Sequence, residues 1–334
     1  MTYRFKLEEP IAQGVRRIGL EQIEMAAAKL ADKDDIAAAI HDARRCLKRL
    51  RALLRLIRPA LSEAAYRRES ERLSGIGRLL SGARDLFVMQ QTVAKVETRF
   101  GALPNGTAAR LRKLMARGNV GGRRAAADGR RQALQRLAQA KRLFAGKAVE
   151  EIELDHILDG LEDAYRRARK AFRQAYRKPS TETFHAWRKR VQAHWRHMAL
   201  LTRGWPEALS ARAGEAKELS RLLGEDHDYA VLSAFAREQG AALAPEDLAA
   251  LVARCEACQA ELRAAARPRG ERLFAEAADD LKERVALYWT SARSLAELAP
   301  AKGEAAAGAG KAAAGKWDGR ATGKRLSGAR YRRR

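Results

Sequence analysis

Apolar residues recur at intervals of three and four positions through most of the chain, the spacing that places them on one face of an α-helix. Alternating apolar and polar runs bounded by turn signals, which are typical of strands, are hard to find. The pattern therefore predicts an all-α protein. We expect helix breaks at proline- and glycine-rich positions, which are Pro59, 101–106, 118–122, Pro179, Pro206, Gly240 with Pro245, and Pro268.

Two of the expected helices have clear starting signals. Asp34 or Asp35 can cap one helix, because a short side chain with an oxygen atom accepts a hydrogen bond from an N–H group of the first turn. Ser180 or Thr181 can do the same for a helix that follows Pro179.

The chain also contains an internal repeat at an offset of 143 to 147 residues. The segment IHDARRCLKRLRALLRLIRP aligns with FHAWRKRVQAHWRHMALLTRGWP, which pairs His41 with His185. Further along, LLSGARDLFVM aligns with LLGEDHDYAVL and pairs Asp85 with Asp228. Agreement at several points in the same order predicts two related helical halves about a pseudo-twofold axis, with a shared surface between them. The halves are about 7–147 and 150–297.

The first repeated helix has an apolar face beside a cationic one. Its apolar stripe consists of Ile40, Ala43, Leu47, Leu50, Leu54 and Ile57. One residue on, about 100° around the helix, lies a basic stripe of His41, Arg44, Lys48, Arg51, Arg55 and Arg58. Like charges at i,i+4 destabilise a helix by some tenths of a kcal/mol per pair. A ligand that supplies negative charge would relieve this repulsion.

The second repeated helix has the same design. Its predicted core stripe is Phe184, Trp187, Val191, Trp195 and Met198, and its polar side carries His185, Arg188, Lys189, Arg196 and Arg203, interrupted by Gln192. A single run of charge is usually the solvated face of an amphipathic helix. Two related helices that are both basic and both begin with histidine favour an anion site instead. Arginine suits this task because its planar guanidinium can hold two phosphate oxygens at once.

Composition supports an anionic partner. The 334 residues include 66 Lys and Arg against 41 Asp and Glu, a formal net charge of +25. Such an excess repels itself unless an anion offsets it. The segment 301–334 carries +8, so the 300 residues before it are still basic, at +17. Aromatic residues make up 6% of the chain, too few for repeated base-stacking surfaces, which favours a bare chain of charge as the ligand.

The ends of the chain and its cysteines indicate where the protein works. The low-complexity segment 301–334 lacks sizeable apolar residues until its last part, so we expect it to be disordered and to act as an accessory basic arm that contacts nucleic acid without specificity. No apolar run approaches the ~18 residues of a membrane span. The opening MTYRFKLEEP does not look like a secretory signal, and three cysteines are a sparse set, so we expect a cytoplasmic location.

The repeated pattern of a histidine, an arginine three residues later and then clustered Arg and Lys resembles the CHAD (conserved histidine α-helical domain) family over about 7–297. The short acidic motifs at 83–85 and ending at Asp228 also resemble that family. The resemblance implies two helical bundles whose basic helices face a central channel that accepts inorganic polyphosphate. It implies recruitment to polyphosphate granules, without catalysis or a cofactor. The polyphosphate-binding residues that we expect are His41, Arg44, Arg45, Lys48, Arg49, Arg51, Arg55, His185, Arg188, Lys189, Arg190 and Arg196.

The sequence departs from the family pattern in two respects. Gln192 and Ala193 stand where the second half would often be basic, so the ligand surface is expected to be stronger on the first half. The triphosphatase domain to which the family is often fused carries a Glu-x-Glu-x-Lys motif, and the nearest string here, EIELD at 151–155, lacks the lysine. We therefore expect the binding module alone.

Two other classes of function fit some of the same observations. A nucleic-acid-binding protein would account for the net charge and the basic tail. A metal-dependent phosphohydrolase would need grouped carboxylates, which the sequence does not show.

Metal sites of other kinds also have weak support. Cys255 and Cys258 form a C-x-x-C without a second ligand pair, so we expect them to be small core residues rather than zinc ligands. His194 and His197 have a spacing that metal ligands can use, yet the neighbouring Arg196 would repel a cation. We expect no metal site.

Overall fold

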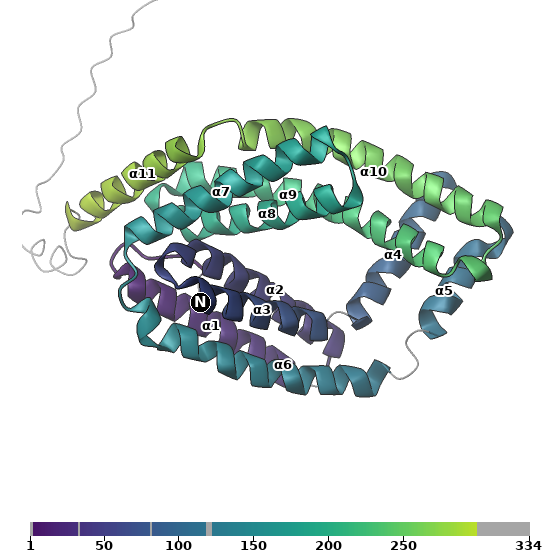
Figure 1. Cartoon of the computed structure of the whole chain (residues 1–334), viewed down its shortest axis with the longest axis horizontal. Coiled ribbons are helices and arrows are strands. Elements are labelled where there is room, and N and C mark those ends of the chain that lie inside the picture. The colour runs from purple at the N-terminus through teal and green to yellow at the C-terminus, as the bar shows by residue number, and fades with distance from the viewer. Residues whose placement is uncertain (1–2, 33, 81, 118–121, 299–334) are drawn as a thin grey trace, which may run out of the picture. The chain divides into compact units, whose positions relative to one another are not determined.

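The computed structural model describes residues 3–298 apart from 33, 81 and 118–121, and the side chains of 82–85 and 122–126 are also not described. Within these residues the chain consists of α-helices and short 3₁₀ turns, without a strand (Figure 1). The all-α prediction is confirmed. The prediction of a disordered arm at 301–334 lies outside the described residues.

The described residues form eleven α-helices, and α2 is followed directly by the 3₁₀ turn η1 (Arg58–Ala60). The helices are α1 (Ile11–Ala31), α2 (Ile36–Leu56), α3 (Glu63–Leu79), α4 (Gly82–Phe100), α5 (Thr107–Arg117), α6 (Gly122–Ala145), α7 (Leu154–Arg177), α8 (Thr181–Leu200), α9 (Pro206–Glu238), α10 (Pro245–Leu273) and α11 (Ala278–Leu298).

The two repeated helices, α2 and α8, begin at the predicted caps. The side chain of Asp35 accepts a hydrogen bond from the backbone N–H of Ala38 at 2.9 Å. The Ser180 hydroxyl accepts one from the backbone N–H of Thr183 at 3.2 Å, and the Thr183 hydroxyl accepts one from the backbone N–H of Ser180 at 3.0 Å. This reciprocal capping box satisfies N–H groups that would otherwise lack partners.

One predicted break is wrong. Pro179, Pro206 and Pro245 lie at helix boundaries as expected, but Pro268 lies inside α10. A proline within a helix removes one hydrogen bond to the carbonyl four residues earlier. Here both Pro268 and Ala264, which carries that carbonyl, are exposed, so water can hydrate the freed group. The packing of the rest of α10 against α9 offsets the cost.

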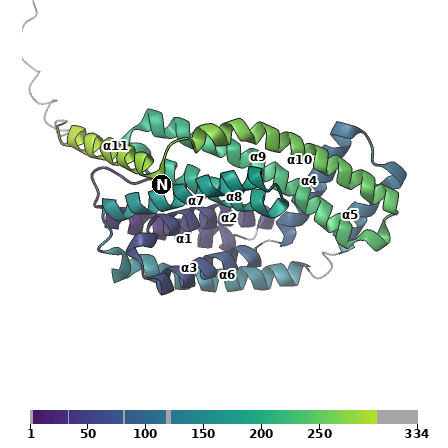
Figure 2. The ribbon, with the colours of Figure 1, turned by 45° about the horizontal axis from the view of Figure 1, so that its top comes forward.

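The apolar core has two clusters, and each draws on both halves of the repeat. The larger cluster includes side chains from α1, α2, α3 and α6 together with α7, α8, α9 and α11. The smaller one joins α4 and α5 to the end of α9 and the beginning of α10, which lie beside them in both views (Figures 1 and 2). Cys255 and Cys258 are buried in this smaller cluster. The two repeats therefore share their cores, and a pseudo-twofold axis between them stays a prediction.

Helices α2 and α8 pack against each other within the larger cluster. All six residues of the predicted α2 stripe are buried, as are Phe184, Trp187, Val191 and Met198 of the α8 stripe, while Trp195 is half-buried. The His197 imidazole Nε2 lies 2.9 Å from the backbone oxygen of Ala52, a contact that is fully buried. With Nε2 protonated, the ring donates to that carbonyl and joins the two helices directly.

The end of α2 is also in very close contact with α7. A Cβ atom placed on Gly160 would lie 1.8 Å from the backbone oxygen of Leu56, a distance that no side chain can accept. Because the obstacle is buried backbone, it cannot rotate away. Only glycine allows α7 to approach α2 this closely.

We predict that Gly160→Ala lowers the melting temperature strongly, because the added methyl group forces the two helices apart. Gly214→Ala on α9 is the matched control, since a Cβ there meets nothing within 4 Å and alanine favours the helix by up to about 1 kcal/mol. Thermal unfolding followed by circular dichroism compares the two. A Gly160→Ala protein as stable as the control would contradict the close packing of α2 and α7.

Candidate anion-binding site

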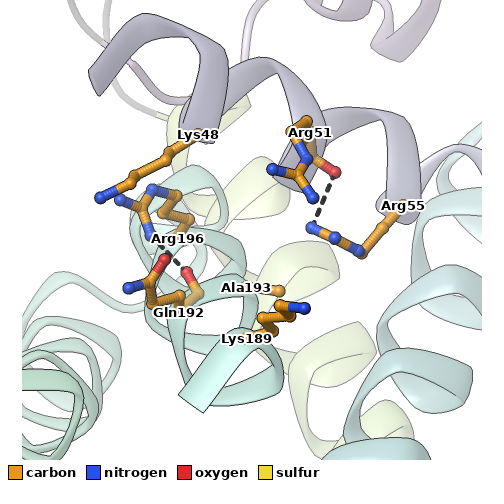
Figure 3. Close-up of a pocket in the computed structure, with 7 residues that line it drawn as sticks. All are labelled: Lys48, Arg51, Arg55, Lys189, Gln192, Ala193 and Arg196. Carbon is orange, nitrogen blue, oxygen red and sulfur yellow. Dashed lines mark hydrogen bonds between the residues drawn. The ribbon is translucent and has the colours of Figure 1, made fainter. Parts of the chain in front are cut away.

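The basic sides of α2 and α8 meet at a pocket, which we call the first pocket (Figure 3). Its volume is ≈ 30 Å³, so an anion larger than a water molecule would be held at its mouth. Side chains of the two helices point toward one another across the gap. The lining residues are Lys48, Arg51 and Arg55 of α2 and Lys189, Gln192, Ala193 and Arg196 of α8.

Helical spacing explains why these residues converge. Arg51 and Arg55 are four residues apart and therefore lie on the same side of α2. Lys189 and Arg196 are two turns apart on α8, and the small Ala193 between them is buried. The apolar stripes hold the backbones of both helices in the core, so the cationic arms extend into the space between them.

Four of the five cations that line the first pocket have no carboxylate partner among the described residues. Among the described residues, no ion pair includes Arg51, Arg55, Lys189 or Arg196. Instead Arg55 donates to the backbone oxygen of Arg51 at 3.3 Å, and Arg196 donates to that of Gln192 at 2.6 Å. The guanidinium of Arg196 also lies 4.1 Å from the centre of the Trp195 ring. Backbone dipoles and an aromatic face position these cations without neutralising them.

Burial and the nearby positive charges lower the pKa values of several cations in the first pocket. Burial lowers the pKa of Arg55 to about 10, and the nearby positive charge of Arg51 contributes further. Burial likewise lowers the pKa of Arg196 to about 10, and it also lowers that of Lys189, where Arg51 and Arg55 add to the effect. With pKa values of about 10, Arg55 and Arg196 are still protonated at neutral pH. The ligand-free pocket therefore holds several uncompensated cations.

A second pocket, of ≈ 370 Å³, adjoins the first and shares Arg55 and Lys189 with it. Its other lining residues are Arg58, Tyr66, Arg167, Ala186 and Arg190. Elements α2, η1, α3, α7 and α8 thus all contribute to a continuous basic groove, which we define as the first and second pockets together.

The remaining α2 residues that the sequence predicted do not line either pocket. Arg44 donates to the backbone oxygens of Gly77 at 3.2 Å and Leu80 at 3.0 Å, which ties α2 to the end of α3. Arg49 donates to Gln22 at 3.2 Å. Arg45 is exposed and pairs with Asp42, and His41 is half-buried and in contact with other residues.

His185 lies beside the groove and faces another histidine. Its ring stacks on that of His227 from α9, with the ring centres 4.2 Å apart and the planes inclined by 26°. Burial lowers the pKa of His185 to about 4 and that of His227 to about 3, and Arg188 and Lys189 lower both further. Both rings are therefore neutral at pH 7, and Arg188 lies close enough to influence each of them.

The acidic motif at the end of the repeat has a structural role on α9. Asp226 is buried and accepts hydrogen bonds from Arg263 at 2.6 Å and from Gln259 at 3.2 Å, both on α10. Asp228, which the sequence singled out, has contacts with other residues. The side chain of Asp85 lies outside the described residues.

His194 and His197, whose spacing metal ligands can use, form hydrogen bonds with other residues. His194 accepts a hydrogen bond from Arg212 at 3.2 Å, and His197 binds the Ala52 carbonyl. In the part of the chain that the structure describes, no three His, Cys, Asp or Glu side chains are grouped so that they could hold a metal ion.

Sequence reasoning missed some residues of the groove. Arg58 lies on the predicted basic stripe but was not among the expected ligand contacts, and Arg167 and Tyr66 had no signal of their own. The run YRRARKAFRQAYRK at 165–178 showed that α7 is basic, but not which of its arginines faces α2.

Comparison with known families agrees with this arrangement. The sequence matches the CHAD domain family over residues 17–237, which is most of the chain and includes both basic helices. The protein therefore belongs to the CHAD domain family. No curated protein matches it significantly. Among the described helices, none is long and apolar enough to cross a membrane.

We predict that Arg51→Gln raises the melting temperature of the ligand-free protein by a few degrees, because it removes a half-buried cation that has no carboxylate partner. Arg131→Gln is the control, since Arg131 is exposed and paired with Asp128. Differential scanning calorimetry of the two variants tests this. A lower melting temperature for Arg51→Gln alone would show that Arg51 stabilises the fold.

We also predict that the protein loses stability as the pH falls from about 6.5 to about 4. Burial lowers the pKa of His197 to about 4 and those of His185 and His227 to similar values, below the ordinary 6.5. The unfolded state therefore binds more protons in this window, and acidification favours unfolding. Urea unfolding at several pH values measures the slope, which His227→Gln should reduce. An unfolding midpoint that is constant across the window would exclude this coupling.

Proposed function

We propose that the protein binds inorganic polyphosphate without catalysing its conversion, and that the basic groove is the binding site. The observation that carries the proposal is the first pocket, where Arg51 and Arg55 of α2 converge with Lys189 and Arg196 of α8, and none of these four has an ion pair among the described residues. Membership of a family associated with polyphosphate supports the same ligand. Association with polyphosphate granules would follow from this binding.

The form of the groove favours a linear chain of phosphates. Cations on successive turns of α2 are about 6 Å apart along the axis, so a flexible polyanion can contact several of them in a row. Each arginine can hold phosphate oxygens through a charge-assisted fork. Release of condensed counterions adds to the affinity and makes it strongly dependent on salt.

Replacing Arg51, Arg55 and Lys189 together by Gln should weaken polyphosphate binding on the order of 100-fold, because three charge-assisted contacts are lost. The slope of log Kd against log salt concentration should fall by about 2. The matched control replaces Arg131, Arg237 and Arg267, which are exposed and paired with carboxylates, and removes the same net charge. Isothermal titration calorimetry at several salt concentrations measures both. Equal weakening in the two triple variants would mean that net charge, rather than the groove, binds the ligand.

Competition with duplex DNA separates this function from nucleic-acid binding. The groove lies between packed helices, and Tyr66 is the one aromatic residue among the described residues that line it, so it offers a bare phosphate chain more contacts than a duplex. Long-chain polyphosphate should displace duplex DNA at equal phosphate concentration. Displacement in the opposite direction would assign the protein to nucleic-acid binding.

The absence of catalysis is open to a direct assay. The described residues that line the groove are mostly cationic and include no carboxylate, and the nearby Asp163 and Glu63 are paired with arginines rather than placed as general bases. We expect no release of phosphate above background when the protein is incubated with polyphosphate and Mg²⁺ or Mn²⁺. Release that disappears in the Arg51, Arg55 and Lys189 triple variant would identify a phosphohydrolase.

A further inference from the structure

The second pocket differs from the first in its charge balance. Arg167 pairs with Asp163 through both carboxylate oxygens, at 3.0 and 2.8 Å. Arg58 pairs with Glu63 at 3.1 Å and approaches Asp163 at 4.0 Å. In the first pocket, by contrast, Arg51 and Arg196 have no ion pair among the described residues. The two ends of the groove therefore present different surfaces to an anion.

The groove is also long enough for an extended chain to contact more of its cations than a short anion can. Arg51 and Arg55 are one helical turn apart on α2, and Arg58 follows in η1. The lining of the groove runs from Lys48 in the first pocket to Arg58 in the second. An extended chain can continue from the first pocket past the shared Arg55 and Lys189 to Arg58, whereas a short anion contacts fewer of these residues at once.

We propose that the second pocket is an extension subsite that selects long polyphosphate chains, and that Asp163 and Glu63 compete with phosphate for Arg167 and Arg58. The inference rests on the proposed function of the groove. A chain gains from the second pocket only when it reaches Arg58 and Arg167 and replaces their carboxylate partners. Short chains bind through the first pocket alone.

The ion pairs of the second pocket are suited to this exchange. The side chains of Asp163 and Glu63 are 35% and 48% exposed, and ion pairs at this level of exposure contribute only about 0–1 kcal/mol to stability. A polyphosphate offers more charge than either carboxylate. The Tyr66 ring, 4.8 Å from the Arg58 guanidinium, keeps that group in the pocket when Glu63 releases it.

The unpaired cations of the second pocket add to its attraction for a chain. Arg190 has no ion pair among the described residues, and burial lowers its pKa, with the charge of Arg167 contributing further. Arg190 lines the second pocket together with the shared Lys189 and the paired Arg58 and Arg167. A phosphate group can therefore contact Arg190 without displacing a carboxylate from it.

The test compares tripolyphosphate with long-chain polyphosphate in calorimetric titrations of full-length protein. Arg167→Gln should weaken long-chain binding about tenfold and leave tripolyphosphate binding unchanged. Asp163→Asn should strengthen long-chain binding by roughly two- to fivefold, because it removes the competitor. This gain of affinity cannot arise from misfolding.

Matched controls lie on the same helix. Asp159→Asn makes the same charge change one turn away, where Asp159 pairs with Lys282 at 2.6 Å outside the groove. Arg166→Gln neutralises the exposed neighbour of Arg167, which pairs with Glu162. Both controls should leave the ratio of long-chain to tripolyphosphate affinity at its original value.

The outcomes separate the extension subsite from the binding function itself. If Arg167→Gln and Asp163→Asn change the affinities for both ligands equally, or no more than their controls do, the extension subsite is refuted while the groove can still bind polyphosphate. If Arg51→Gln and Arg196→Gln in the first pocket leave the binding of both ligands intact, the proposed function fails, and the extension subsite fails with it.

Discussion

Repulsion among like charges is the constraint around which this molecule is organised. Two helices bring arginine and lysine side chains together across a narrow pocket, where Arg55 and Arg196 contact backbone oxygens and an aromatic ring and have no ion pair among the described residues. Such an arrangement costs free energy in the absence of a ligand. It persists because the opposite faces of the same helices are buried in a large apolar cluster that extends over both halves of the chain. The free energy gained by burying this apolar surface thus offsets the repulsion among the cations of the groove.

The positions of the carboxylates determine which arginines of the basic surface are neutralised. The protein has many exposed ion pairs, including those of Arg131 and Arg267. They neutralise many surface arginines, whereas Arg51, Arg55 and Arg196 of the first pocket have no such ion pair among the described residues. Net charge alone would predict attraction for any polyanion. The distribution of carboxylates instead concentrates that attraction along one line between α2 and α8.

The sequence predicted the part of this site that depends on helical periodicity. An apolar stripe and a basic stripe with the same repeat fix which face of a helix is buried, and so Arg51, Arg55 and Lys189 could be named from their spacing alone. Helical periodicity does not predict which neighbouring helix packs against a given turn. Arg44 lies on the same basic stripe of α2, yet it contacts the end of α3 instead of the groove, because the neighbouring helices change along the length of α2.

The residues that escaped prediction depend on contacts between distant segments. Arg167 enters the groove because Gly160 allows α7 to approach the end of α2, a relation between positions that no local pattern records. Pro268 was read as a break because its cost to the helix is local, whereas the compensation comes from packing against α9. For Pro268, tertiary packing overrode a local signal, whereas Arg167 had no local signal that could reveal its position.

The hydrogen bond between His197 and the Ala52 carbonyl has a consequence for recognition. Because this buried link joins α2 and α8 within the core, it holds the two helices at a fixed separation without a ligand. If the groove binds polyphosphate as we propose, the backbone needs no rearrangement on association, and the loss of conformational entropy is confined to the arginine and lysine side chains. Such a site would combine a rigid backbone with flexible cationic side chains, which suits a ligand chain of variable shape.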